Sequence, residues 1–278
     1  MNEIEVLASG PLTTVQDRGR PGWAHVGVPP SGAVDPIALA HGNRLVGNDT
    51  VAAALEATLI GPRLRFDAEA LVALTGATYR GPFVVRAGEV LEVGACRHGV
   101  RAYVTVRGGI EVEPVLGSRS ADLLSRLGPP PLQDGDVLSI GAEPDGEPDA
   151  DLDPPPALPV EPVLRVLPGP RDDWFDPGAL EALVAGPWQV SLSSNRIGVR
   201  LEGPPLARAG EKELLSEGLV AGALQVPPSG QPILLLNDHP TTGGYPVLGV
   251  VLEDDLPLAG QLRPGQRLRF AVNHGSQP

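Results

Sequence analysis

Residues 70–109, ALVALTGATYRGPFVVRAGEVLEVGACRHGVRAYVTVRGG, set the expected fold class. The expected strands are 70–75 (ALVALT), which is almost wholly apolar, and 83–93 (FVVRAGEVLEV) and 102–106 (AYVTV), where apolar positions tend to alternate with other residues. A period of two places successive side chains on opposite faces of an extended chain. The stretch therefore predicts three strands of a mainly β protein.

A second pattern recurs along the chain, in which a Gly and a polar residue precede alternating apolar positions. It occurs at 88–93 (GEVLEV), 135–140 (GDVLSI) and 265–270 (GQRLRF). Each unit predicts a tight turn that leads into a strand. With 35 Gly and 32 Pro among 278 residues, the chain is turn-rich and β-dominated.

Helices are expected at few places, and one begins at Asp35. The pair Asp35-Pro36 supplies an N-cap and a first-turn proline before IALAHGNRLVGN. We expect Ile37, His41 and Leu45 to share one face of this helix.

Two further short helices are expected. One covers 121–127 (ADLLSRL), capped by Ser118 or Ser120. The other follows Asp176-Pro177 and covers GALEALVAG. All three helices are expected to pack as minor elements on sheets.

The chain is expected to form two β lobes joined by a linker. The predicted boundaries are 1–142 for the first lobe, 143–162 for the linker and 163–278 for the second lobe. The linker, EPDGEPDADLDPPPALPVEP, is acidic and Pro-rich, which predicts a solvated, extended segment. The pentapeptide VPPSG occurs at 28–32 and again at 226–230, either by chance or because the lobes are related.

Composition narrows the class of protein. A formal net charge of −13 argues against a nucleic-acid partner. The single cysteine, Cys96, excludes an internal disulfide, and no Cys/His spacing matches a zinc site. No apolar run approaches the ~20 residues of a membrane span, and no basic-then-apolar signal opens the chain. We therefore expect a cytoplasmic protein that does not bind membranes.

Polar residues gather in a Gly- and Pro-rich segment near the N-terminus. Gln16, Asp17 and Arg20 lie there, where constrained turns fix side chains as a ligand site requires. Alternatively, Asp17 and Asp35 cap backbone amides and the loop is structural.

A second candidate segment is Ser193-Ser194-Asn195-Arg196. An arginine beside an amide and hydroxyls suits a carboxylate or phosphoryl ligand, because its planar fork makes paired hydrogen bonds. The alternative is a surface ion pair between Arg196 and Glu202.

The third candidate is NDHPTTGGYP, residues 237–246, between two apolar runs. Its backbone amides could face an anion, although Gly-Gly turns also serve ordinary hairpins. The sequence contains no GxxxxGK[ST] phosphate loop, GxSxG or HExxH motif, and no biotin-acceptor lysine context. Residue chemistry by itself thus gives no complete catalytic set.

Eleven ordered motifs carry a resemblance that covers nearly the whole chain outside the acidic linker. They are GPLTTVQDRGRPG, GVPPSGAVDPIAL, NRLVGN, LEATLIGP, VRGGIEV, GSRS, LPGPRDDWF, SSNRIGVRLEG, SEGLVAGALQVPPSGQPILLL, TTGGYPVLGVV and QLRPGQRLRF. Together they resemble the C subunits of bacterial 5-oxoprolinase, in the biotin-dependent carboxyltransferase-like (allophanate hydrolase subunit 2-like) family.

The resemblance implies two cyclophilin-like β-barrel lobes with a few short helices. It also implies a subunit of an ATP-dependent lactam hydrolase that opens 5-oxoproline to glutamate. Such a protein would be inactive alone and would act with homologues of the 5-oxoprolinase A and B subunits, sharing ATP with them. The same family includes carboxyltransferase portions of urea amidolyase or allophanate-type systems, and a non-catalytic branch that antagonises a kinase inhibitor.

Carried over position by position, the resemblance implies a set of site residues and no metal site. The implied catalytic residues are Asp17, Asn195 and Arg196. The implied substrate-binding residues are Gln16, Arg20, Gln225, Thr242, Gly243, Gly244 and Tyr245. The chain departs from the family pattern at 128–133 (GPPPLQ) and at His239-Pro240.

Overall fold

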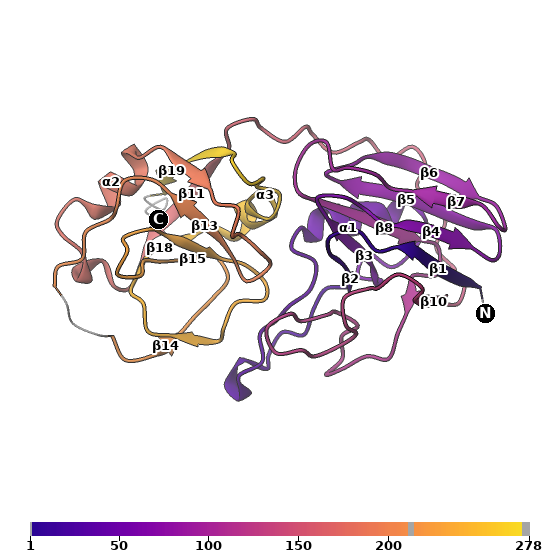
Figure 1. Ribbon diagram of the computed structural model, residues 1–278, viewed down its shortest axis with the longest axis horizontal. Coiled ribbons are helices and arrows are strands. Elements are labelled where there is room, and N and C mark those ends of the chain that lie inside the picture. The colour runs from indigo at the N-terminus through magenta and orange to yellow at the C-terminus, as the bar shows by residue number, and fades with distance from the viewer. Residues whose placement is uncertain (1, 211–213, 274–278) are drawn as a thin grey trace. The chain divides into compact units, whose positions relative to one another are not determined.

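The computed structural model describes residues 2–210 and 214–273, and the chain in it divides into two compact units (Figure 1). Unit 1 comprises Met1–Pro21 and Pro30–Ala157, and unit 2 comprises Gly22–Pro29 and Leu158–Pro278. The main division falls within the stretch that was expected to be a linker. Both units are built mainly from strands, which confirms the predicted fold class.

In the described part of unit 1, the strands form two five-stranded sheets. The first has the order β7 (Val90–Glu92), β4 (Arg63–Phe66), β1 (Glu3–Ala8), β10 (Val137–Ile140) and β9 (Ile110–Glu111). The second has the order β2 (Thr13–Gln16), β3 (Ala54–Thr58), β8 (Arg101–Val106), β5 (Ala70–Gly76) and β6 (Arg80–Val85). One apolar core contains side chains from both sheets, including Ile4, Phe66, Leu55 and Val104.

The turn at Gly88 corrects the prediction of a single strand over 83–93. Gly88 has a φ of 78°, a conformation that other residues rarely adopt. The turn interrupts the strand, so that β6 pairs with β5 in one sheet and β7 pairs with β4 in the other. The three Gly units nonetheless behave as predicted, because Gly135 and Gly265 also have positive φ and precede β10 and β19 (Arg267–Val272).

Unit 2 contains a closed barrel with the strand order β11, β18, β15, β16, β13, β12, β19. The bounds are β11 (Val163–Pro168), β18 (Val247–Val251), β15 (Ala223–Gln225), β16 (Ile233–Leu235), β13 (Gly198–Glu202) and β12 (Trp188–Val190). Parallel pairing between β11 and β19 closes it. Outside the barrel, β14 (Glu217–Gly218) pairs with β17 (Thr242–Gly243).

Trp188, at the start of β12, is one of the largest fully buried side chains of the protein. Its ring is fully buried, and its indole N–H donates to the Leu183 carbonyl at 2.7 Å. A Cβ at Gly203 would lie 2.5 Å from this ring, so glycine is needed there to make room for the indole. The bond to Leu183 also holds helix α2 (Ala179–Ala185) against the barrel.

Helix α1 (Pro36–Leu45) begins as predicted at Asp35, whose side chain accepts a hydrogen bond from the Ala38 N–H at 2.9 Å. The predicted face was wrong, because Ile37 is 61% exposed. Small residues decide which face is buried: a Cβ at Gly42 would lie 2.8 Å from the Thr105 side chain. The helix therefore lies close against β5 and β8.

The other helix predictions fared differently. Helix α2 forms, but its N-cap is Gly178 and not Asp176. No helix forms over 121–127: the Asp122 carboxylate accepts from the N–H groups of Leu124 and Ser125, but the chain leaves the helical conformation at Arg126, which has a φ of 58°. Helix α3 (Leu256–Gly260) and the 3-10 turns η1 (Ala24–Val26), η2 (Asp172–Trp174) and η3 (Glu253–Asp255) complete the described elements. None of the helices described is long and apolar enough to cross a membrane.

The first part of the expected linker differs from a solvated segment because Arg107 binds it to unit 1. The guanidinium donates to the Glu143 carboxylate at 2.9 Å and to the carbonyls of Pro144 and Gly146 at 3.0 and 2.9 Å. It also donates to the Val46 carbonyl at 3.0 Å, beside α1. The prediction of a free, extended segment was based on repulsion between its like charges. The positive charge of Arg107 offsets part of that repulsion.

We expect Arg107→Ala to release residues 143–149 from unit 1. Three backbone carbonyls and a carboxylate lose their donor, which should cost about 1–3 kcal/mol of unfolding free energy. Hydrogen–deuterium exchange of the amides in 143–149 should accelerate. Arg44→Ala is the matched control, because it removes only an exposed ion pair with Asp149 and should cost at most about 1 kcal/mol. Unchanged exchange in Arg107→Ala would contradict the docking.

Candidate functional site

In unit 1, the Asp17 carboxylate organises the first candidate loop. It accepts hydrogen bonds from the Gly19 N–H at 2.7 Å and the Arg119 N–H at 2.6 Å. The hydroxyls of Ser118 and Ser120 donate to it at 2.6 and 2.5 Å. The bond from Gly19 is local, and the other three join the loop after β2 to the GSRS segment. The geometry matches the alternative in which Asp17 caps backbone amides, and it explains why neither serine caps a helix.

Arg20 serves the same junction. The side chain is buried, and the guanidinium donates to the carbonyl of Val115 at 3.2 Å and to that of Ser120. Asp17 and Arg20 therefore both bind the segment 115–120, one through its N–H groups and hydroxyls and the other through its carbonyls.

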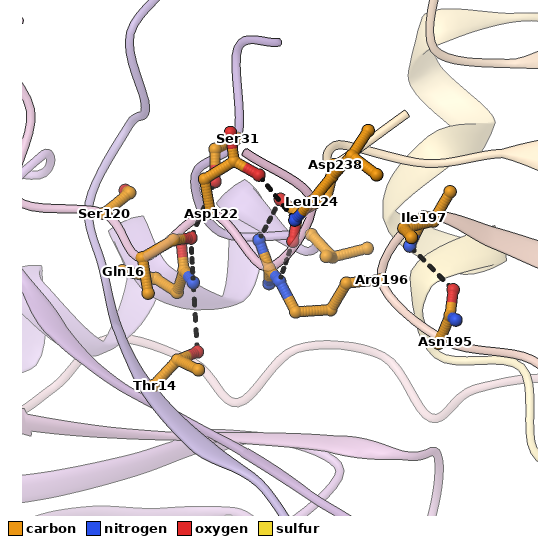
Figure 2. Close-up of polar contacts among 12 residues, drawn as sticks. Thr14, Gln16, Ser31, Ser120, Asp122, Leu124, Asn195, Arg196, Ile197 and Asp238 are labelled. Atoms are coloured by element: carbon orange, nitrogen blue, oxygen red, sulfur yellow. Dashed lines mark hydrogen bonds and ion pairs between the residues drawn. The ribbon is translucent and has the colours of Figure 1, made fainter. Parts of the chain in front are cut away.

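Gln16 lies at the end of β2 with its amide fixed in one orientation (Figure 2). Its Nε2 donates to Thr14 Oγ1 and to the Ala121 carbonyl, both at 3.0 Å. Because the carbonyl can only accept, the nitrogen must face it, and Oε1 points elsewhere. Among the residues that the structure describes, Oε1 has no hydrogen-bond partner although the side chain is fully buried. An oriented, buried acceptor of this kind suits an N–H donor.

In unit 2, Asn195 forms a local turn just before Arg196 in the chain. Its Oδ1 accepts from the N–H groups of Ile197 at 2.9 Å and Gly198 at 3.3 Å (Figure 2). This bonding is the pattern by which Asn replaces a backbone turn. The turn fixes the chain just before β13.

Arg196 is paired with Asp238, and the alternative pairing with Glu202 was wrong. Nε and Nη2 of Arg196 donate to the two carboxylate oxygens of Asp238 at 2.9 and 3.0 Å (Figure 2). The Arg196 side chain is 1% exposed and that of Asp238 is fully buried. The planar fork expected of Arg196 is therefore present, but the carboxylate it binds belongs to the protein.

We expect removal of one member of this buried pair to destabilise unit 2 strongly. Arg196→Met leaves the Asp238 carboxylate without this partner, at a cost of about 3–5 kcal/mol. The double variant Arg196→Met/Asp238→Leu should lose less than the sum of the two single variants. Thermal unfolding of the four proteins of this cycle measures the coupling. Additive losses would show that the pair contributes nothing.

A cavity of about 980 Å³ lies in unit 2. Three segments line it, and their lining residues are Pro205, Leu206, Ala207, Arg208, Gly210, Leu214, Pro228, Ser229, Gly230, Gly244 and Tyr245. Gly244 and Tyr245 belong to the implied binding set. The second VPPSG copy contributes Pro228, Ser229 and Gly230, although no role in binding was predicted for that pentapeptide.

Gln225 supports the wall of this cavity without lining it. Its Nε2 donates to the Tyr245 carbonyl at 3.2 Å. Gly243 is in close contact with the same amide, since a Cβ there would lie 2.8 Å from Nε2. Gly244 faces the Leu214 carbonyl, 3.1 Å from where its Cβ would be. The two glycines therefore let the loop approach Gln225 and the segment at Leu214.

Thr242 is less involved in the cavity. It is exposed and pairs with Gly218 in the short ladder between β14 and β17. Arg171 holds that ladder through a forked ion pair with Glu217. Thr242 and Gly243 therefore pair with a distant segment, and this ladder is not the ordinary hairpin that was weighed as an alternative.

Arg208 is the residue that the sequence interpretation missed. It is a charged side chain in the cavity wall, between β13 and β14. In the sequence PPLARAG no motif distinguishes it from a surface arginine. Only the contact of its segment with the VPPSG turn, through the Leu206 N–H and the Gly230 carbonyl at 2.9 Å, could have indicated it.

Two histidines, His239 and His41, have a pKa below the ordinary value of the imidazole. Burial lowers the pKa of His239, which outweighs the opposing effects of the Pro240 carbonyl, 2.8 Å from Nδ1, and of Asp238. Burial, together with the charge of Arg44, lowers the pKa of His41 in unit 1. Both rings are therefore neutral in the folded protein at pH 7.

We expect stability to fall as pH falls from about 7 to about 5.5. The unfolded chain protonates these imidazoles near their ordinary pKa of about 6.5, whereas the folded chain resists protonation. Tm measured across this range should decrease for the native chain and decrease less for His239→Asn, which keeps a donor for the Pro240 carbonyl. Adding His41→Asn should flatten the profile further. A native Tm that does not change between pH 7 and 5.5 would contradict this interpretation.

No group of three or more His, Cys, Asp or Glu residues that could hold a metal ion occurs within residues 2–210 and 214–273.

The sequence model of a protein family, the carboxyltransferase domain, subdomain A and B, matches residues 26–272 of this chain. The chain belongs to this carboxyltransferase domain family. The match confirms the resemblance stated from the ordered motifs.

Members of the family with quite different total lengths are similar to this chain. The C subunit of 5-oxoprolinase from Escherichia coli K12 is 40% identical, with 96% of this chain and 90% of that protein aligned. The urea amidolyase of Lachancea kluyveri is 34% identical over 96% of this chain but only 17% of its own length. The crystal structure of the K. lactis urea amidolyase superposes with a TM-score of 0.88 at 34% identity, covering 97% of this chain and 18% of that one.

Proposed function

We propose that this chain is one component of an ATP-dependent 5-oxoprolinase, which opens 5-oxoproline to glutamate together with partner subunits. The observation that carries the proposal is the end-to-end alignment with the E. coli C subunit, which spans 96% of one chain and 90% of the other. Among fungal urea amidolyases, by contrast, the same domain makes up less than a fifth of the protein.

Partner subunits are expected for a chemical reason as well. Opening a lactam adds water across the C–N bond, and coupling this step to ATP requires phosphate recognition. The sequence contains no phosphate loop, and the described residues hold no cluster of metal ligands. We propose that ATP is shared with the A and B subunits and that this chain takes part in recognising the lactam.

Two features of the described residues support a role in recognising the lactam. The cavity of unit 2 combines a cationic side chain, hydroxyl groups and apolar surface, as small-molecule sites do. In unit 1, the oriented Oε1 of Gln16 can accept a hydrogen bond from an N–H group.

We expect the purified chain alone to show no 5-oxoproline-dependent ATP hydrolysis. Turnover should appear when the A and B subunits are added, and the mixture of those two proteins without this chain should be inactive. ATP consumption and glutamate formation, measured together, check the coupling. Turnover by this chain alone would contradict the proposal.

The carboxyltransferase role is the second candidate, because the family model and the fungal structures carry that name. Affinity purification of the tagged chain from its source cells separates the two. A biotinylated partner with urea-dependent transfer would support the carboxyltransferase role. A partner that binds without either turnover would support a regulatory protein.

A further inference from the structure

Glu56 is a buried carboxylate of unit 1 that is not among the implied site residues. It lies on β3, and its side chain is fully buried. In the register of the sheet it stands directly opposite Thr14 on β2 and Tyr103 on β8. We propose that Glu56 is a positioning residue, which holds the segment 31–35 and thereby orients the Gln16 amide. The link to a ligand rests on the proposed function, in which Gln16 accepts a hydrogen bond from an N–H group.

The Glu56 carboxylate holds the segment 31–35 at two successive backbone N–H groups. Its Oε2 accepts from the Val34 N–H at 2.9 Å and from the Tyr103 hydroxyl at 2.7 Å. The Tyr103 oxygen in turn accepts from the Asp35 N–H at 2.8 Å. One N–H group is therefore held directly by Glu56 and the next through Tyr103.

Tyr103 and Arg101 are the side chains that face the Glu56 carboxylate. Burial, together with the charges of Glu56 and Asp35, raises the pKa of Tyr103, so the hydroxyl keeps its proton and remains a donor to Glu56. On the other side of the carboxylate, Arg101 Nε lies 3.4 Å from Glu56 Oε1. A buried ion pair often adds little net stability, because desolvation of both charges opposes their attraction. The effect that we assign to Glu56 is therefore on position.

Ser31 connects the held segment to Gln16. Its hydroxyl donates to the Ala121 carbonyl at 2.8 Å, and Gln16 Nε2 donates to the same carbonyl at 3.0 Å. The second acceptor of Nε2 is Thr14 Oγ1, also at 3.0 Å (Figure 2). One acceptor of the Gln16 amide is thus shared with the segment that Glu56 holds, and the other lies opposite Glu56 in the sheet.

The backbone at Ser31 needs support of this kind. Ser31 has a φ of 52°, in the left-handed region that residues other than glycine rarely adopt. The next residue, Gly32, has a φ of 90°, and a Cβ there would lie 2.8 Å from the Arg18 backbone. Strained backbone persists only where its surroundings hold it, and it concentrates at functional sites. The bonds at the Val34 and Asp35 N–H groups anchor one side of this strained turn.

The test follows the side-chain amide of Gln16 by NMR in the whole chain, in the native protein and in Tyr103→Phe. The variant removes the hydroxyl between Glu56 and Asp35 and keeps the aromatic ring in the core. Exchange of the Gln16 Nε2 protons with solvent should accelerate on the order of tenfold, because one hydrogen bond to a charged group is lost. Tyr79→Phe, which removes a hydroxyl from an exposed tyrosine of the same unit, is the matched control and should leave this exchange unchanged.

The backbone amides of β1 and β4, in the other sheet of unit 1, distinguish positioning from stability. If Tyr103→Phe only loosened unit 1, exchange of these amides and of the Gln16 side chain would accelerate by the same factor, and that result would overturn the inference. Glu56→Met should act like Tyr103→Phe. Glu56→Gln should fall between it and the native chain, because an amide oxygen can accept both bonds whereas its NH₂ group carries no charge for Arg101.

Native-like exchange of the Gln16 amide in Tyr103→Phe or in Glu56→Met would also overturn the inference. Tyr103→Phe removes a single oxygen atom, so it decides where Glu56→Met does not fold. In the reconstituted complex, Tyr103→Phe should raise the KM for 5-oxoproline on the order of tenfold, and an unchanged KM would overturn the link to ligand recognition. The proposed function fails separately, when the complete complex does not turn over 5-oxoproline while exchange of the Gln16 amide still responds to Tyr103→Phe.

Discussion

The buried fork between Arg196 and Asp238 is the interaction on which the candidate site of unit 2 depends. It joins the turn before β13 to the start of the loop over 237–246, two segments that are 42 residues apart in sequence. Removing two charges from water is costly, and only a bidentate geometry with further hydrogen bonds offsets that cost. The ion pair fixes the place where the loop leaves the barrel. The far end of the same loop contributes Gly244 and Tyr245 to the cavity wall.

Charged side chains also join loops at other places where the chain has little regular structure. Asp17 gathers four donors from two loops, and Arg107 gathers one carboxylate and three carbonyls from segments on either side of β8. In a chain with short helices and many turns, backbone groups at element ends need partners, and ionised side chains are strong ones. Several charged residues that would suggest catalysis in a sequence therefore hold loops together here.

The residues of the candidate site therefore have different structural roles. Four of the implied residues hold loops in place, namely Asp17, Arg20, Asn195 and Arg196. Three others differ from them: Gly244 and Tyr245 line the cavity, and Gln16 has a buried acceptor without a hydrogen-bond partner among the described residues. Ligand recognition is better supported for these three. The family to which the chain belongs includes a separate subunit in Escherichia coli and a domain that aligns with 17% of a fungal urea amidolyase.

Local sequence was enough to predict the class of fold, the turns that lead into strands and the start of α1, because these depend on neighbouring residues: a period of two, a glycine with positive φ, an Asp-Pro cap. The ordered motifs also identified the family. Long-range packing settled which sheet each half of 83–93 joins, which face of α1 is buried and which carboxylate Arg196 binds. It also placed Arg208 in the wall of a cavity. These outcomes depend on residues that are distant in the chain, so no local pattern could specify them.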